Sequence, residues 1–198
     1  MKNKSFCLSM FLAISLLAIP AYSETEENAE TVSQIKDEQV KTVHDTIKDK
    51  ITQIWQEGRI ELFIPIYAWH NRESYPRHKI DNYNEDPRGF GIGKHIVNTK
   101  GNRERILAIG FSDSNYHFEP LVLYTWQKLW HGKGNFFRFS AGYMAGFTTR
   151  KEWHWVPLPM GLPIISIEAG PLSFENTYIP GLGKDNGNVW FSWASVRF

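Results

Sequence analysis

Most of the chain after residue 58 alternates between apolar residues and small or polar ones. The run over 136–148 is the clearest case, because residues two apart share a face of a strand. One face of this run is apolar or aromatic, and it comprises Phe137, Phe139, Ala141, Tyr143, Ala145 and Phe147. The other face is mostly small or polar and includes Arg138, Ser140, Gly142 and Gly146. A period of two with one lipid-compatible face is typical of a strand in a membrane-spanning barrel.

Runs of this kind recur along the chain and predict eight strands, at 61–70, 89–97, 105–113, 119–128, 136–148, 156–166, 171–178 and 188–198. Each run is about as long as a tilted strand must be to cross a bilayer. We therefore expect an all-β fold, an eight-stranded antiparallel transmembrane β-barrel over residues 58–198. An even strand number places the connections 71–88, 114–118, 149–155 and 179–187 at one end, which we take as external.

Three segments precede the barrel. Residues 1–23 have a basic start, a short apolar stretch and Ala21-Tyr22-Ser23, which predicts a cleaved signal peptide. Residues 24–37 are acidic and aperiodic, which predicts a flexible linker. Residues 38–57 carry apolar positions three and four apart, which predicts an amphipathic helix that ends near Gly58. The helix would cover a soluble core or lie at a membrane surface, and the pattern leaves both open.

Composition narrows the function classes. The single cysteine, Cys7, lies in the signal segment, so the exported chain has neither a disulfide nor a cysteine nucleophile. The mean hydropathy is −0.38, yet all eight tryptophans follow the signal segment. This aromatic content fits either a soluble β protein or a membrane barrel, in which aromatic residues form girdles at the two interfaces. No metal-binding motif or phosphate-binding loop occurs in the sequence. We expect no metal, no cofactor and no nucleic-acid partner.

The predicted lumen is apolar towards its external end. The inward positions of the run 119–128 include Leu121, Leu123 and Thr125, followed by Gln127. A barrel of eight strands has room for side chains or one small ligand, so an apolar upper lumen indicates a pocket for an apolar molecule.

Four prolines affect the pairing of strands in the barrel wall, because each removes a ladder hydrogen bond. They mark either strand ends and bulges or gaps through which a lipid chain enters: Pro65, Pro87, Pro163 and Pro180.

Candidate chemistry gathers at the external rim. His70 ends the first strand, and Asp113 and Ser114 end the third at the same side. A histidine, a carboxylate and a hydroxyl are the components of general-base-assisted acyl transfer. Taken singly, Asp-Ser is also an ordinary turn dipeptide and a rim histidine is commonly just solvated. The first and third external connections are basic, which suits a phosphorylated lipid headgroup or a solvated loop.

At these positions the chain resembles the PagP family of lipid A palmitoyltransferases, from the amphipathic helix to Phe198. The shared motifs are Ile64-Pro65 with Trp69-His70, Tyr83-Asn84-Glu85 with Pro87, Phe111-Ser112-Asp113-Ser114 with Glu119-Pro120, Pro157-Leu158-Pro159, and Tyr178-Ile179-Pro180-Gly181 with Asn186-Gly187-Asn188-Val189.

The resemblance implies an enzyme of the Gram-negative outer membrane, with its active site at the external face. It would move palmitate from a glycerophospholipid to lipid A, the lipid part of lipopolysaccharide. His70, Asp113 and Ser114 match the family's catalytic residues, and Lys79 matches a lysine tied to lipopolysaccharide recognition. The four prolines match the family's strand-gap positions. We expect a monomer.

Two departures from the family pattern concern selectivity. The loop at 182–185 is one residue longer, and Gly183 stands near the place of the family's gating tyrosine. Thr125 replaces the glycine that floors the family's acyl pocket, so chains shorter than palmitate could be preferred. Two other classes remain open from the residues: a non-enzymatic small barrel that binds a lipid or partner, and a soluble exported lipocalin-like carrier.

Overall fold

The computed structural model describes residues 26–132, 136–181 and 187–198. The predicted signal segment 1–23 and the predicted gating-loop residue Gly183 lie outside the described residues. The chain divides into two compact units, Met1–Ile47 and Lys48–Phe198. Among the described residues, no helix combines the length and apolarity needed to cross a membrane.

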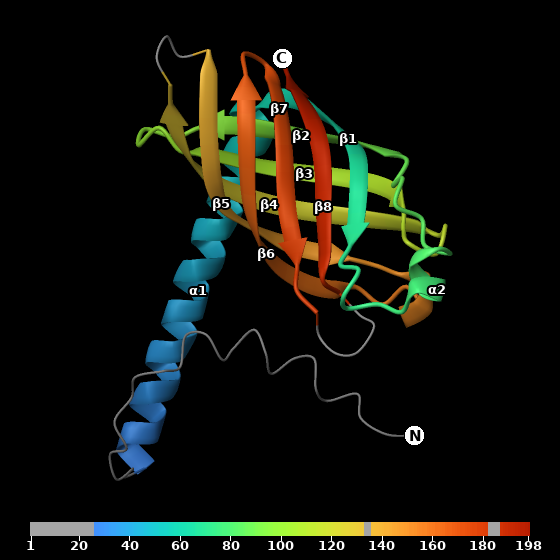
Figure 1. The fold of residues 1–198 in the computed structure, drawn as a ribbon. Coiled ribbons are helices and arrows are strands. Elements are labelled where there is room, and N and C mark those ends of the chain that lie inside the picture. Colours follow the sequence, from blue (N-terminus) through green and yellow to red (C-terminus); the bar gives the residue numbers. More distant parts are fainter. Residues whose placement is uncertain (1–25, 133–135, 182–186) are drawn as a thin grey trace. The chain divides into compact units, whose positions relative to one another are not determined.

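The second unit is a closed antiparallel barrel in which each strand pairs with its neighbours in chain order and β1 pairs with β8 (Figure 1). The strands are β1 Arg59–His70, β2 Gly89–Val97, β3 Arg103–Ser112, β4 Phe118–His131, β5 Phe137–Thr148, β6 Leu158–Ala169, β7 Leu172–Ile179 and β8 Val189–Arg197. The eight predicted strands are confirmed, and their ends differ from the expected ones by three residues or fewer.

Side chains alternate between the outer wall and the lumen as the sequence pattern predicts. On β5, Phe137, Tyr143 and Phe147 are exposed, whereas Ser140 and Met144 on the other face are buried. The exposed aromatic and aliphatic residues continue around the wall, for example Phe90 on β2 and Ile167 on β6. A wall of this composition suits lipid, because contact with hydrocarbon removes the cost of exposing apolar surface to water.

The lumen has two layers of different chemistry. The layer towards α2 (Arg77–Ile80) is an apolar cluster, made of Phe63, Ala68, Leu107, Ile109, Leu121, Leu123, Met144, Leu162, Ile164, Phe191 and Trp193. The opposite layer is a network of buried charges and hydroxyls, including Glu61, Arg103, Arg105, Gln127, Ser140, Ser166, Glu168, Glu175 and Ser195. Arg105 alone donates to Glu175, Glu61, Gln127 and Thr125. Such charges tolerate burial because each is paired.

The N-terminal helix α1 (Glu26–Glu57) ends where predicted but begins earlier. Residues 26–37, expected as a flexible linker, are helical. The linker interpretation rested on acidic, aperiodic composition, yet glutamate, alanine, glutamine and lysine have high intrinsic helix propensity. Within the second unit, Ile54 is fully buried, while Ile51 and Trp55 remain exposed. The expected apolar stripe is therefore only partly covered in the second unit.

Two stretches of the wall lack strand pairing. β1 pairs with β2 only as far as Phe63↔Gly91, while its pairing with β8 continues to His70↔Val189. Likewise, β6 pairs with β7 only from Ile165↔Asn176 to Ala169↔Leu172. Pro65 lies in the first unpaired stretch and Pro163 in the second. Pro87 precedes β2, and Pro180 follows β7.

The end of the barrel that carries α2 collects the candidate residues. α2 lies at the end opposite the C-terminus (Figure 1). Because the strands are antiparallel, the β1–β2, β3–β4, β5–β6 and β7–β8 connections all meet at the end with α2. This confirms that His70, at the end of β1, and Ser114, just after β3, share one rim.

Candidate active site

His70 and Ser114 form a direct hydrogen-bonded pair. The Nε2 atom of His70 lies 2.8 Å from the Oγ atom of Ser114, although the two residues are 44 positions apart in the chain. His70 is 1% exposed, so its ring is held in the rim rather than solvated. A base within hydrogen-bond reach of a hydroxyl is the arrangement that proton transfer from that hydroxyl requires.

The other ring nitrogen of His70 faces Glu85, which was not among the catalytic candidates predicted from the sequence. Nδ1 lies 3.2 Å from Oε1 of Glu85, and the same oxygen accepts the backbone N–H of His70 at 3.0 Å. Glu85 belongs to the long β1–β2 connection, which has no periodic pattern to predict its position. The available signal was its place in the motif Tyr83-Asn84-Glu85.

Glu85 is held as a carboxylate by several donors. Arg72 donates to its two oxygens at 2.5 and 2.6 Å, and the Tyr67 hydroxyl donates to Oε2 at 3.0 Å. Partial burial would by itself raise the pKa of the Glu85 carboxyl, but hydrogen bonds from Arg72, His70 and Tyr67 lower this pKa to about 2. The carboxylate is thus ionised at neutral pH and accepts hydrogen bonds without donating any.

This ionisation determines the tautomer of His70. Since Glu85 can only accept, Nδ1 of the neutral imidazole carries the proton and donates to it. Nε2 is then the unprotonated nitrogen and accepts the hydroxyl proton of Ser114. The rim therefore presents a base directed at a hydroxyl, with a carboxylate behind the base.

Asp113 lies beside Ser114, but among the described residues its side chain has no hydrogen bond or ion pair with His70. Its Oδ1 atom accepts the backbone N–H groups of Asn115 and His117, both at 2.8 Å. These bonds close the turn between β3 and β4. The structure therefore brings His70 and Ser114 together and gives the Asp113 side chain the geometry of a turn-forming residue.

Aromatic rings enclose His70 on two sides. The ring of Tyr83 lies 4.8 Å from that of His70, and the ring of Tyr75 lies 5.7 Å away, edge-on. The Tyr75 hydroxyl donates to the carbonyl of Gly187, which ties the β1–β2 connection to the residues before β8. The enclosure limits ring rotation of His70.

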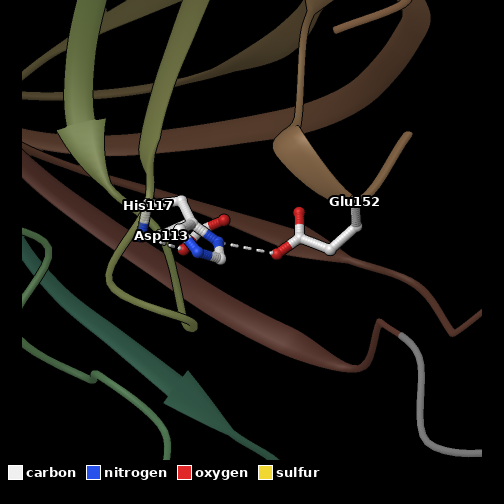
Figure 2. A group of neighbouring side chains, drawn as sticks. All are labelled: Asp113, His117 and Glu152. Carbon is white, nitrogen blue, oxygen red and sulfur yellow. Dashed lines mark hydrogen bonds and ion pairs between the residues drawn. The ribbon is translucent and has the colours of Figure 1, made fainter. Parts of the chain in front are cut away.

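A second cluster on the rim was not visible in the sequence spacing. Asp113, His117 and Glu152 offer ligand atoms within 4.8 Å of one another, the geometry of a possible metal site (Figure 2). However, Lys151 Nζ lies 3.2 Å from Nε2 of His117. An ammonium group only donates, so Nε2 accepts and Nδ1 carries the proton towards Glu152, at 3.0 Å (Figure 2).

The charges around this cluster argue against a cation there. Arg150 approaches Oδ2 of Asp113 at 3.5 Å and Oε2 of Glu152 at 3.8 Å. Metal binding requires a deprotonated ligand atom, and here the ring proton, Arg150 and Lys151 already compensate the carboxylates. We assign the cluster to a network that joins the β3–β4 turn to the β5–β6 connection.

The remaining predicted residues occupy the expected elements. Lys79 lies on α2 at this rim. Leu121, Leu123 and Thr125 all point into the lumen, with exposed fractions of 7%, 2% and 0%. Thr125 lies at the boundary of the two layers, because its Oγ1 atom accepts a hydrogen bond from Nε of Arg105 at 2.9 Å.

A closed barrel with a lipid-compatible wall and a base–hydroxyl pair at its rim defines a small membrane-embedded barrel with acyl-transfer geometry. Comparison with known proteins agrees. The family described as antimicrobial peptide resistance and lipid A acylation protein PagP matches residues 50–195. The chain therefore belongs to the PagP family of outer-membrane barrels.

Named relatives cover most of the chain. A lipid A acyltransferase PagP of Edwardsiella tarda is 40% identical over 156 residues, which is 78% of this chain and 84% of the relative. One of Laribacter hongkongensis is 41% identical over 145 residues, or 73% of this chain and 69% of the relative. One of Salmonella typhimurium is 34% identical over 198 residues, or 99% and 96% respectively.

Proposed function

We propose that this protein is an outer-membrane enzyme that transfers a fatty acyl chain from a glycerophospholipid to lipid A. Acyl transfer to lipid A follows from membership of the PagP family, whose relatives are named lipid A acyltransferases. The single observation that carries the chemistry is the 2.8 Å contact between His70 Nε2 and Ser114 Oγ. The glycerophospholipid donor, the external position of the site and a monomeric state are further parts of the proposal.

His70 acts as the general base in this proposal. An ester C–O bond of the donor breaks and a new one forms to a hydroxyl of lipid A. The proton of that hydroxyl ends on the leaving glycerol oxygen. Transfer runs either directly or through an ester on Ser114, and in both routes Nε2 of His70 takes and returns the proton. Asp113 contributes by holding the turn that presents Ser114.

The wall supports lateral entry of the lipids. Pro65 lies in the unpaired stretch of β1, and Pro87 precedes the neighbouring strand β2. Pro163 lies in the unpaired stretch of β6, and Pro180 follows the neighbouring strand β7. Because these stretches lack a continuous ladder, they are the places where an acyl chain can pass between strands at least cost. We propose them as the two access routes.

The donor's tail would occupy the apolar layer of the lumen. Leu121 and Leu123 line it, and Thr125 marks where the lining turns polar. A hydrocarbon gains nothing by entering the charged layer, so the tail stops there. We further propose that Lys79 contacts a phosphate of lipopolysaccharide, and that Gly183 belongs to the loop that gates access.

Mass spectrometry of lipid A tests the proposal. Cells that express the protein should contain lipid A with one additional acyl chain. His70→Ala and Ser114→Ala should each lower transfer by about 10²–10⁴-fold, because loss of a general base or its partner costs that much.

His131→Ala is the matched control, because His131 is an exposed histidine at the end of β4 that lies away from the rim with His70 and Ser114. Near-normal lipid A acylation by His70→Ala would contradict the enzymatic proposal and favour a barrel that merely binds lipid. Purified protein with labelled glycerophospholipid tests the donor, which should lose one acyl chain for each chain gained by lipid A.

A further inference from the structure

The segment that contains Glu85 is hydrogen-bonded to both parts of the chain that carry the catalytic pair, His70 and Ser114. The backbone carbonyl of Glu85 accepts the N–H of Ala68 at 3.1 Å. Ala68 lies in the part of β1 that is not paired with β2. The residue before Glu85, Asn84, donates its backbone N–H to the carbonyl of Ser114 at 2.9 Å. The segment 84–85 therefore bridges β1, which carries His70, and the turn that carries Ser114.

The Glu85 carboxylate is surrounded by hydrogen-bond donors of the described residues. They are the backbone N–H and Nδ1 of His70, the two terminal nitrogens of Arg72 and the hydroxyl of Tyr67. Only a group with two accepting oxygens satisfies all of them. An amide in the same place would direct an N–H at one of these donors.

We propose that Glu85 is a positioning residue for the acyl transfer: it holds His70 in the tautomer that directs Nε2 at Ser114, and it stabilises the imidazolium formed when His70 takes the proton. The inference rests on the proposed function of His70. The physical reason is that an anion 3.2 Å from Nδ1 favours a proton on that nitrogen and lowers the energy of the charged ring.

Arg72 has a supporting part. It is bidentate on Glu85 and lies over the ring of Trp69 at 5.8 Å, which anchors it to the outer wall. The groups that face His70 are thus the Glu85 carboxylate, which is paired with Arg72, the Ser114 hydroxyl, and the rings of Tyr75 and Tyr83. Glu85 is the only anion among these contacts of the described residues.

The experiment compares Glu85→Gln, Glu85→Asp, Asp86→Asn and His70→Ala as purified proteins in detergent, with kcat and KM measured across pH. Glu85→Gln should lower kcat by roughly 10²-fold, the scale of a general-base contribution, with little change in KM. The acid limb of its kcat profile should move to lower pH, because the imidazolium has lost its neighbouring anion. Glu85→Asp should keep the acid limb near its original pH, because it keeps the charge, with a smaller loss of kcat.

Asp86→Asn is the matched control for charge. Asp86 is the next residue, its side chain is 63% exposed, and its carboxylate pairs with Arg88 rather than with the rim pair. It should have the kcat and pH profile of the unmodified protein. Heat-dependent mobility in SDS gels checks that each variant remains a folded barrel.

The outcomes separate the two proposals. If His70→Ala is inactive while Glu85→Gln has full kcat or an unmoved acid limb, Glu85 is not a positioning residue and the role of His70 stands. If His70→Ala keeps its turnover, the proposed function itself is wrong. Should Glu85→Gln not fold, Arg72→Gln gives the same decision. This substitution keeps the Glu85 carboxylate but removes the two hydrogen bonds that Arg72 donates to it. A lower kcat is therefore expected, and an unchanged kcat would overturn the inference.

Discussion

At the scale of single residues, the rim shows how one side chain can support chemistry without touching the reacting atoms. Asp113 neighbours Ser114, but its carboxylate is used by the backbone of Asn115 and His117. Its effect on transfer would come through the turn. Misplacement of a reacting group by about 1 Å can cost on the order of 10²-fold in rate, so a turn-forming residue can be as sensitive to mutation as a base.

Two substitutions of Asp113 distinguish geometry from charge. Asparagine keeps an oxygen that accepts both N–H groups, whereas alanine removes it. Asp113→Asn should retain activity within about tenfold of the unmodified protein, and Asp113→Ala should lose on the order of 10²-fold. Transfer assays on purified protein measure both. Equal, large losses in the two variants would show that the charge of Asp113, rather than the turn, matters.

Thr125 should determine how long a tail the lumen accepts. It lies about 20 Å along β4 from Glu119, at roughly 3.3 Å per residue, where the apolar lining meets Arg105. Thr125→Gly removes side-chain volume at this boundary, while Arg105 keeps its bonds to Glu175 and Gln127. The preferred acyl chain should become longer.

The measurement is a competition among phospholipids of graded chain length. Val122→Ala is the control, because Val122 is exposed on the outer face of the same strand and should leave the preference unchanged. An unaltered preference in Thr125→Gly would place the length limit elsewhere in the lumen.

At the scale of elements, the last turns of α1 contribute to stability rather than to the active site. Lys50 forms a 2.9 Å ion pair with Glu104, whose side chain is only 3% exposed. Lys94 donates to the carbonyl of Trp55 and lies 5.3 Å from its ring centre. These contacts are made to β2 and β3, with no catalytic candidate among them.

Deletion of residues 24–56 should therefore lower the thermal unfolding midpoint and leave measurable transfer. A finer variant is Lys50→Met, which removes the cation beside the Glu104 carboxylate but leaves its hydrogen bonds from Asn98 and Tyr124. It should cost roughly 1 kcal/mol of folding stability, since Lys50 is itself partly exposed. Lys48→Met, at an exposed position of the same helix, should have little effect. Complete inactivation of a deletion variant that still forms a stable barrel would contradict this role.

At the scale of the whole molecule, stability comes from closure and from the buried charges of the lumen. A closed barrel pairs its backbone along most of each strand, which is what a bilayer demands of any spanning structure. In the charged layer, Glu168 lies beside Arg103, Arg138 and Arg197. These pairs join β3, β5, β6 and β8 across the lumen, so the wall cannot open without separating them.

The protein should accordingly stay folded in SDS until it is heated. Unboiled samples should migrate differently from boiled ones, and detergent should be needed to extract the protein from membranes. Release by salt alone would contradict a membrane-embedded barrel. A soluble barrel of the lipocalin type would behave in that way.

The sequence by itself determined the strands, their faces and the rim. A period of two records which side of the wall each residue occupies, as the buried Leu121, Leu123 and Thr125 show. An even strand number then places His70 and Ser114 at one end. Where the signal was composition rather than period, at residues 26–37, the linker prediction did not match the helix that forms.

Only the tertiary structure decided which groups meet within the rim and the lumen. Glu85 lies in a connection without periodicity, so no pattern could direct its carboxylate to Nδ1 of His70. Asp113 and Glu85 are both acidic residues of the same rim, and only their hydrogen-bond partners distinguish their roles. Asp113 accepts backbone N–H groups, whereas Glu85 accepts hydrogen bonds from the ring of His70 and from Arg72. The alternation of apolar and polar residues along a strand shows which face of the wall a side chain occupies. Its hydrogen-bond partners, in contrast, depend on distances between segments far apart in the chain.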